Sequence, residues 1–514
     1  MSAPSDAGLA RTPTGAMRLA AAHCWRPHFP TITTMRTDAP DRPQPLPPAR
    51  WWFALSWLCA LTLLALVGCS SLPPREPPLA QAGGQGLVTV RGADGVVAGA
   101  QKRQTLQQLG NEGRHELLRH HLRTLTQTGD ADLYRGNRTK LLVDGPATFA
   151  AMKAAIAKAR SRVLLESYIF EDQGVAAEIA DLLLQRAADG VTVAVIYDAV
   201  GSITTPTEFF QRLTDGGVAV CEFNPINPAR RPGYWGITHR DHRKLLVVDQ
   251  QVAFTGGINI SRVYGSGSAS WRRSARTSGG APIDDGWRDT QIEMRGPVVP
   301  ALATVFEATW REQGCKGELG GTPDQPLAAE PGDRVVKILA SDPRDETNRI
   351  YTALIAAIDA AQVEVHISMA YFAPGQVFVQ ALCDAARRGV SVELVLPGRS
   401  DSSLVLHAGR SYYTQLLQAG VQIHEMDLAV MHAKTAVIDG VFSTVGSSNL
   451  DWISFVANNE LNVIVLGEEF GGQMNALFER DRKDSRAVTL EAWERRGLGG
   501  RLMEGVGRLF ERWL

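Results

Sequence analysis

Two copies of one short pattern carry the groups in this chain that are best suited to chemistry. Each copy reads His-x-Lys-x-x-x-x-Asp, and each is followed at the same distance by a small-residue turn that ends in an asparagine. The residues concerned are His242, Lys244, Asp249 and Asn259 in the first copy, and His432, Lys434, Asp439 and Asn449 in the second. Two imidazoles, two ammonium groups and two amides would together make a symmetric site for a phosphodiester.

The residues that follow each lysine indicate which elements hold these groups. Residues 245–248 and 435–438 are apolar or β-branched runs, which are typical of buried strands with a side-chain period of two. On such a strand the histidine and the lysine point to one face, whereas the aspartate, seven residues after the histidine, points to the other. We therefore expect Asp249 and Asp439 to brace the scaffold rather than to touch a substrate.

The pattern favours phosphoryl chemistry that does not depend on a metal. The two lysines would supply positive charge where the oxygens of a phosphodiester become more negative, and the amides of Asn259 and Asn449 would donate hydrogen bonds to them. One imidazole can attack phosphorus while the other passes a proton near neutral pH, which gives a phosphohistidine intermediate. We expect neither a metal ion nor another cofactor.

These motifs resemble those of the phospholipase D superfamily, and within it the chain is most similar to bacterial cardiolipin synthases. The likeness covers about residues 130 to 480 and, besides the two motifs, includes the stretches 141–145, 166–170, 197–202, 287–290, 446–451 and 458–462. The resemblance implies an α/β fold in which two similar phospholipase D-type domains pack side by side, with one active site at their interface.

The same resemblance implies roles for four residues. Asp289 and Glu460 fit acidic positions that follow the motifs, and each would hold the far nitrogen of the histidine in its own half. His242 would be the nucleophile and His432 the acid and base, although the symmetry of the sequence leaves the reverse assignment open. Ser261 and Ser454 are expected to be turn or cap residues, and His239 to be a packing or rim residue.

Further similarities between the halves indicate that a whole unit is duplicated. Residues 154–156 and 356–358 both read Ala-Ala-Ile, and the two motif histidines are 190 residues apart, a domain-sized period. The predicted organisation is an unstructured or misassigned start over residues 1–34, a signal or anchor segment over 35–69, a linker and helical region over 70–130, domains over 131–325 and 326–485, and an amphipathic tail over 486–514.

The N-terminal part of the sequence predicts a tether to a bacterial membrane. An uncharged apolar stretch over residues 51–68 ends at Cys69, and this boundary resembles the lipobox of lipoproteins, in which the cysteine receives a lipid. A plain membrane-spanning anchor is the alternative, because eighteen apolar residues can just cross a bilayer. Either reading places the chain in the cell envelope with its folded part facing the periplasm, in the inner or the outer membrane.

Three further cysteines, Cys221, Cys315 and Cys383, follow the anchor segment. Their wide spacing shows no metal site, and an odd number cannot pair completely. We expect buried free thiols, with one disulfide as the alternative in an oxidising envelope compartment.

Two segments outside the motifs suit contact with lipid. Residues 265–282 are rich in Gly, Ser and Arg, which predicts either a rim loop that meets headgroups or a disordered insertion. In the tail, leucines, Phe510 and Trp513 recur near helical spacing with arginines among them. That pattern predicts either an in-plane membrane helix or a helix docked on the protein's own surface, and five glycines weaken the first reading.

Composition and charge narrow the class of activity. The chain has 514 residues, 44% of them hydrophobic, which suffices for two cores, and its net charge of −1 offers no basic field to attract nucleic acid. We expect phospholipid substrates, phosphatidylglycerol first, a membrane as partner, no nucleic acid, and no particular oligomeric state. Transfer to a second phosphatidylglycerol would give cardiolipin, whereas water as acceptor would give phosphatidic acid. A superfamily nuclease and a non-catalytic phospholipid-binding protein are the weaker alternatives.

Overall fold

The fold is taken from a computed structural model that describes residues 88–109, 114–125, 132–227, 238–268, 286–320, 331–344 and 348–513. The predicted anchor segment and Cys69 lie outside these ranges, as do residues 269–282 of the predicted rim loop. Within the ranges, no helix combines the length and the hydropathy that crossing a bilayer requires.

The first half of the described chain forms a mixed sheet with the strand order β6-β5-β4-β8-β9-β10-β3. Strands β4, β5 and β6 are parallel to one another, and each neighbouring pair from β4 through β8, β9 and β10 to β3 is antiparallel. The strands are β3 (Asp132–Val143), β4 (Arg162–Ser167), β5 (Thr192–Asp198), β6 (Ala219–Phe223), β8 (Lys244–Val248), β9 (Val252–Gly256) and β10 (Thr290–Arg295).

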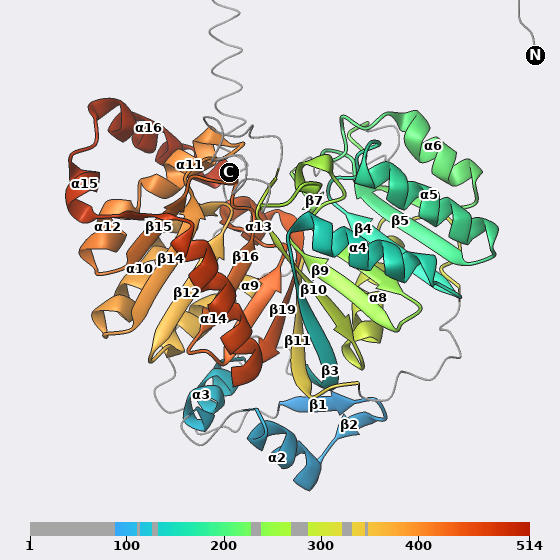
Figure 1. Ribbon diagram of the computed structural model, residues 1–514, viewed down its shortest axis with the longest axis horizontal. Coiled ribbons are helices and arrows are strands. Elements are labelled where there is room, and N and C mark those ends of the chain that lie inside the picture. The colour runs from blue at the N-terminus through green and yellow to red at the C-terminus, as the bar shows by residue number, and fades with distance from the viewer. Residues whose placement is uncertain are drawn as a thin grey trace, which may run out of the picture. The chain divides into compact units, whose positions relative to one another are not determined.

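The second half repeats this order as β15-β14-β12-β16-β17-β19-β11, and the tail adds β20 (Arg486–Val488) beside β15. Strand β11 pairs antiparallel with β3, so the two sheets join edge to edge (Figure 1). The predicted fold class, two similar α/β domains side by side, is confirmed. The strands are β11 (Arg334–Ser341), β12 (Glu364–Met369), β14 (Ser391–Pro397), β15 (Gln422–Met426), β16 (Lys434–Ile438), β17 (Phe442–Gly446) and β19 (Asn458–Leu466).

Helices cover the sheets, and equivalent helices follow equivalent strands (Figure 1). The first half contains α4 (Asp144–Ala157), α5 (Val175–Ala188), α6 (Thr207–Asp215), the short η4 (Arg262–Tyr264) and α8 (Val298–Glu312). The second contains α9 (Arg349–Ala360), α10 (Gly375–Arg387), α11 (Ser403–Arg410), α12 (Tyr413–Gln418), α13 (Trp452–Val456) and α14 (Glu468–Lys483). Two-residue strands β13 (Phe372–Ala373) and β18 (Leu450–Asp451) pair with each other.

The first described elements lie against both halves. They are β1 (Thr89–Gly92), β2 (Gly95–Val97), α2 (Gly99–Gln107) and α3 (His115–Leu125). Strand β1 pairs with β3, and α3 packs on α9. The buried His121 of α3 places its Nε2 2.9 Å from the carboxylate of Asp439, so the predicted N-terminal helical region also supports the second motif.

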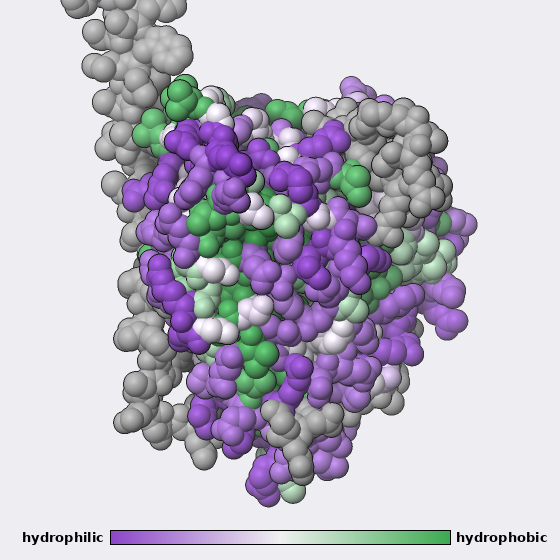
Figure 2. All heavy atoms as spheres, turned by 60° about the vertical axis from the view of Figure 1, so that its left-hand side comes forward, coloured by the Kyte–Doolittle hydropathy of each residue, from purple (hydrophilic) through white to green (hydrophobic). Residues whose placement is uncertain are grey.

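The tail folds back onto the second half. Helix α15 (Leu490–Glu494) packs on α12, and α16 (Leu498–Leu509), followed by η5 (Glu511–Trp513), packs on α11. Figure 2 views this side of the molecule and shows hydrophobic surface at its top, next to strongly hydrophilic surface. The tail therefore packs on the protein's own surface, one of the two placements that the sequence left open.

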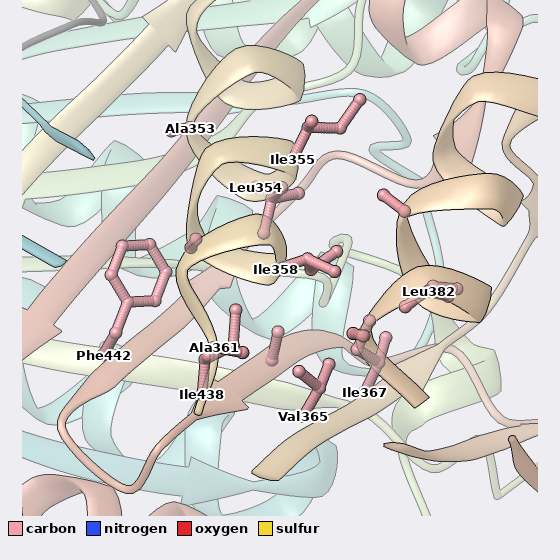
Figure 3. Packing of buried hydrophobic residues seen from close by; sticks show 14 of the residues in the cluster. Ala353, Leu354, Ile355, Ile358, Ala361, Val365, Ile367, Leu382, Ile438 and Phe442 are labelled. Atoms are coloured by element: carbon pink, nitrogen blue, oxygen red, sulfur yellow. The ribbon is translucent and has the colours of Figure 1, made fainter. Parts of the chain in front are cut away.

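The motif strands are buried on both faces, as their apolar sequences predict. In β8, Leu246 and Val248 join the core under α4 and α5, while Leu245 and Val247 join a core shared with α8 and the second half. Strand β16 does the same with α9 and α10: Ile438 lies with residues of both helices in Figure 3. Each motif therefore begins on a rigid, central strand.

The two motif aspartates point away from the histidines and bind backbone, as predicted. Asp249 accepts hydrogen bonds from the N–H groups of Arg160, Ser161 and Arg162 at 2.8 to 2.9 Å. Asp439 does the same for residues 362–364. Both aspartates have φ of 52°, a left-handed conformation that asparagine and aspartate tolerate best. They anchor the turn that ends each motif strand to the start of the neighbouring strand.

Replacing Asp249 with asparagine should therefore reduce stability rather than chemistry. The new amide nitrogen would face the N–H of Arg160, and the remaining contacts would lose their charge assistance, at a cost of about 2 to 3 kcal/mol in the free energy of unfolding. Urea titration followed by circular dichroism measures this loss. A variant with unchanged stability but strongly reduced turnover per folded molecule would contradict the bracing role.

Cys221 of β6 and Cys315 after α8 form a disulfide, with Cα atoms 5.5 Å apart. The expectation of free thiols is wrong for this pair, because the fold brings together two residues that are 94 positions apart in the chain. Cys383 is buried and free, as expected.

Removing the disulfide should lower stability by about 2 to 4 kcal/mol, because closing a long loop restricts the unfolded chain. Thermal unfolding of the Cys221→Ser/Cys315→Ser double variant, compared with the parent in the presence and absence of reductant, measures the loss. The reductant should shift the parent and leave the double variant unchanged; a shift of both by the same amount would sink the prediction.

Candidate active site

The two motif histidines lie together because the segment before each one joins the sheet of the other half. Ahead of His242, β7 (Arg240–Asp241) pairs with the start of β19, and the His242 N–H donates to the Asn459 carbonyl at 3.0 Å. Ahead of His432, the chain forms an isolated β-bridge with Arg288, two residues before β10. The His432 N–H donates to the Arg288 carbonyl at 2.7 Å. Each histidine thus sits beside a strand that the opposite half contributes.

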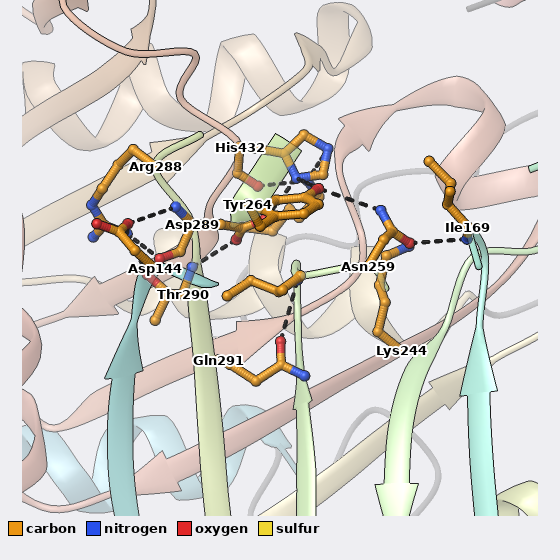
Figure 4. A network of polar contacts seen from close by, with 12 residues as sticks. Asp144, Ile169, Lys244, Asn259, Tyr264, Arg288, Asp289, Thr290, Gln291 and His432 are labelled. Atoms are coloured by element: carbon orange, nitrogen blue, oxygen red, sulfur yellow. Dashed lines mark hydrogen bonds and ion pairs between the residues drawn. The ribbon is translucent and has the colours of Figure 1, made fainter. Parts of the chain in front are cut away.

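The orienting carboxylates are exchanged between the halves, which corrects the own-half pairing expected from the sequence. His242 Nδ1 lies 2.9 Å from an oxygen of Glu460 in β19. His432 Nδ1 lies 2.7 Å from an oxygen of Asp289, directly before β10 (Figure 4). Both carboxylates are fully buried. The physical reason is the strand exchange, because the segment before each histidine is attached to the acidic strand of the other half.

The two lysines open the motif strands and are buried beside the histidines. Lys434 Nζ lies 3.1 Å from His432 Nε2 and donates to the His432 carbonyl at 2.6 Å. Burial lowers the pKa of Lys244 to about 7 and that of Lys434 to about 8. Each lysine also lowers the pKa of the histidine in the other half, so the four groups share one electrostatic environment.

The turn after the first motif brings Asn259 close to this cluster. Asn259 Nδ2 lies 3.4 Å from the Tyr264 hydroxyl, and its Oδ1 accepts from the Ile169 N–H at 3.2 Å (Figure 4). Asn449 is buried, and its Oδ1 has no hydrogen-bond partner within the described ranges. Glycine is required at position 257 in the turn after the first motif, because a Cβ at Gly257 would lie 2.2 Å from an oxygen of Asp289.

Two tyrosines flank the histidines and were not singled out from the sequence. The ring of Tyr168, just after β4, meets that of His242 edge-on at 5.0 Å, and Lys244 Nζ lies 5.2 Å from the same ring. The ring of Tyr371, just after β12, meets that of His432 at 6.1 Å. A tyrosine within two residues of the end of the equivalent strand in both halves was the available signal.

The pair formed by His242 and Glu460 favours an ionised carboxylate and a neutral imidazole. Burial alone would raise the pKa of Glu460, but the His242 imidazole, Lys244 and a donated Ser447 hydroxyl together lower it. Burial lowers the pKa of His242. With its Nδ1–H donated to Glu460, the imidazole keeps the lone pair on Nε2, which is the arrangement that a nucleophile needs.

The pair formed by His432 and Asp289 is electrostatically different. Glu460 accepts from a serine hydroxyl, whereas the equivalent residue beside Asp289 is Gly257. Burial raises the pKa of Asp289 to about 7. Burial and Lys434 lower the pKa of His432 well below its ordinary value, and the Tyr264 hydroxyl lies 3.0 Å from its Nδ1. This pair can therefore hold a proton near neutral pH and release it readily, as an acid and base must.

We expect kcat/KM to fall as the pH rises above about 7. Lys244 with a pKa of about 7, Lys434 with about 8 and the Asp289 pair with about 7 all lose protons in that direction, and each is needed in its protonated form. Initial rates on a phosphodiester lipid in constant-ionic-strength buffers give the profile, with circular dichroism as the control for unfolding. A rate that keeps increasing through this range would contradict the assignment.

The remaining site predictions concern three neighbouring residues. His239 packs edge-on against Phe223 and places its Nε2 2.8 Å from Asn459 Oδ1, as expected of a packing residue. Ser261 caps η4 by accepting from the Val263 N–H, in line with the expected cap role. Ser454 is buried within α13.

Comparisons with known proteins agree with this geometry. Residues 152–265 and 354–482 match a family model described as cardiolipin synthase, PLD-like domain. The chain is 31% identical over 412 residues to a cardiolipin synthase of Alkalihalophilus pseudofirmus, covering 80% of this chain and 78% of the relative. It is 33% identical over 374 residues to cardiolipin synthase A of Pseudomonas putida, covering 72% of this chain and 73% of the relative.

Among solved structures, phosphatidylserine synthase of Haemophilus influenzae Rd KW20 matches with a TM-score of 0.52 at 12% identity, over 73% of this chain and 92% of that chain. At that identity the likeness shows the fold alone. The two matched regions of the family model each contain one complete motif and its strand. With the identity to the curated relatives, they show that this chain belongs to the cardiolipin synthase family of phospholipase D superfamily enzymes.

Proposed function

We propose that this chain is a membrane-associated phosphatidyltransferase that makes cardiolipin from phosphatidylglycerol through a phosphohistidine intermediate. The observation that carries the proposal is the exchange of carboxylates, His242 with Glu460 and His432 with Asp289, beside two buried lysines. The names of the curated relatives support cardiolipin as the product.

In the first step, His242 Nε2 attacks the phosphorus of one phosphatidylglycerol. The N–P bond forms and the P–O bond to the glycerol headgroup breaks, while the proton held by His432 and Asp289 passes to the departing glycerol oxygen. The groups proposed to stabilise the phosphoryl oxygens are Lys244, Lys434, Asn259 and Asn449.

In the second step, the free headgroup hydroxyl of another phosphatidylglycerol gives its proton to His432 and attacks the same phosphorus. The P–N bond breaks, which regenerates His242 and leaves cardiolipin. The two proton transfers cancel, so the net reaction converts two phosphatidylglycerols to cardiolipin and glycerol.

Water in place of the second lipid would make the enzyme a phospholipase D that releases phosphatidic acid. Both histidines are nearly buried, 8% and 5% exposed, which favours an acceptor held by the site over bulk water. The superfamily nuclease is the weaker alternative, because the chain's net charge is −1.

The deciding experiment incubates the full-length protein with acyl-labelled phosphatidylglycerol, with and without a chelator, and separates the lipids. Cardiolipin formed with equimolar glycerol, unaffected by the chelator and absent with His242→Ala, supports the proposal. Phosphatidic acid as the sole product would replace it with the hydrolase, and unchanged lipid beside degraded DNA would replace it with the nuclease. Exchange of labelled glycerol into phosphatidylglycerol tests the covalent intermediate separately.

We further propose that the segment ending at Cys69 tethers the enzyme to the envelope, facing the periplasm. A lipid on Cys69 predicts that Cys69→Ala remains unlipidated by mass spectrometry and loses processing of the preceding segment. Unchanged mass and membrane retention in this variant would favour the plain anchor instead.

A further inference from the structure

Helix α16 turns its apolar side chains outward. Leu498, Leu502 and Leu509 are 82%, 70% and 75% exposed, which makes them the three most exposed large hydrophobic residues in the described part of the chain. Met503 and Phe510 are also exposed. Positions 498, 502 and 509 share one face of a helix, so the leucines form a single ridge, here called the leucine ridge. A ridge of this kind in water indicates an interaction surface.

The opposite face of α16 docks through small and polar residues, the reverse of an ordinary surface helix. A Cβ at Gly507 would lie 2.4 Å from the Ala408 nitrogen, so only glycine permits this close approach to α11. Glu504 is buried and forms two contacts of 2.8 Å with Arg496. These contacts hold the helix in an orientation that keeps the leucine ridge exposed.

Two arginines line the flank of the leucine ridge. Arg501 and Arg508, about two turns apart on α16, border a hollow of about 430 Å³ between α16, α15 and the α11–α12 region. The other charged groups there are Glu494 and the mutually paired Arg496 and Glu504, so the hollow has a net positive charge. An apolar ridge flanked by guanidinium groups complements a surface of acyl chains and phosphates.

The placement of α16 agrees with such a surface. In Figure 1, α16 and α11 lie at the same end of the folded unit as β7, which precedes His242, whereas β1, β2 and α3 lie at the opposite end. Figure 2 shows hydrophobic and hydrophilic surface side by side at that end. A membrane that contacts the leucine ridge would therefore lie at the end of the molecule that holds β7.

We propose that α16 docks on the surface of an anionic phospholipid membrane, with the leucine ridge among the acyl chains and with Arg501 and Arg508 at the phosphates. The helix then sets the orientation of the active site relative to its substrate, independently of any N-terminal tether. For its activity readout this inference rests on the proposed function.

The first test places an environment-sensitive fluorophore on the leucine ridge of the full-length protein through Leu502→Cys. Vesicles of phosphatidylglycerol and phosphatidylcholine should shift the emission to the blue, vesicles of phosphatidylcholine alone should not, and the shift should shrink in high salt. The same label at Val96→Cys on β2 is the control for an exposed site at the opposite end. A shift without vesicles would mean that protein covers the ridge: a second copy if it grows with concentration, and a segment of this chain if it does not. Either result overturns the proposal.

The second test measures turnover of vesicle phosphatidylglycerol and of a short-chain phosphatidylglycerol below its micelle concentration. The Leu498→Ser/Leu502→Ser/Leu509→Ser variant should lose at least about tenfold on vesicles and less than about twofold on the short-chain lipid. Arg501→Gln/Arg508→Gln should lose activity on vesicles only. The controls Val96→Ser and Arg119→Gln should keep their activity on both substrates. Equal activity on vesicles would refute membrane docking. If the unmodified protein turns over neither lipid, the proposed function fails, and the fluorescence test still decides the docking.

Discussion

Replacing either motif histidine with alanine should reduce turnover of phosphatidylglycerol by at least about 10⁴-fold, the scale on which losing a nucleophile or its acid partner acts. The two variants should differ with a phosphatidyl ester of p-nitrophenol, whose leaving group needs no proton. With His432→Ala, His242 can still attack, so a burst of p-nitrophenol equal to the enzyme concentration should appear. With His242→Ala, no burst should appear.

Rapid mixing with absorbance detection measures the burst, and acid-labile label on the protein identifies phosphohistidine. His115→Ala, at the start of α3 and outside the cluster of histidines and lysines, is the matched control and should keep full turnover. A burst with His242→Ala instead of His432→Ala would reverse the roles, and substantial turnover of phosphatidylglycerol by either motif variant would remove the histidines from the mechanism.

The second prediction concerns the exchanged carboxylates. Glu460→Gln and Asp289→Asn should each lower kcat by about 10² to 10⁴-fold, because the amide no longer fixes the imidazole tautomer or stabilises its charge. The pairing itself can be tested in the His432→Ala background, where the burst depends on His242 alone. Adding Glu460→Gln should slow that burst by about 10²-fold or more, whereas adding Asp289→Asn should change it by less than about threefold.

The opposite outcome, a burst sensitive to Asp289 and indifferent to Glu460, would mean that each carboxylate serves the histidine of its own half. Near-ultraviolet circular dichroism of each double variant serves as the control for loss of tertiary packing. Because both double variants carry one carboxylate-to-amide change at a fully buried position, they are matched in kind.

The sequence allowed the motif strands and their bracing aspartates to be predicted, because a period of two and a run of β-branched residues constrain side-chain direction locally. Asp249 and Asp439 indeed bind the backbone of the neighbouring strand. Local patterns of this kind need no knowledge of the partner strand. The fold class, in contrast, was implied by the resemblance to the phospholipase D superfamily.

The carboxylate exchange could not be predicted, because it depends on which sheet a two-residue strand such as β7 joins, and so short a segment carries no periodicity. The disulfide likewise depends on the contact of β6 with the end of α8, 94 residues away. In the tail, helical spacing revealed the leucines, but only the close approach of Gly507 to α11 determines that they face outward.

Because β7 pairs with β19, the two lobes cannot be separated without breaking both histidine–carboxylate pairs. A polypeptide cleaved between α8 and β11 would yield two fragments, each with an imidazole deprived of its counter-ion and each inert alone. Mixed, the fragments should complement each other, because every missing acid is supplied by the other piece. The covalent link between the lobes therefore keeps the two mutually dependent halves in a one-to-one ratio.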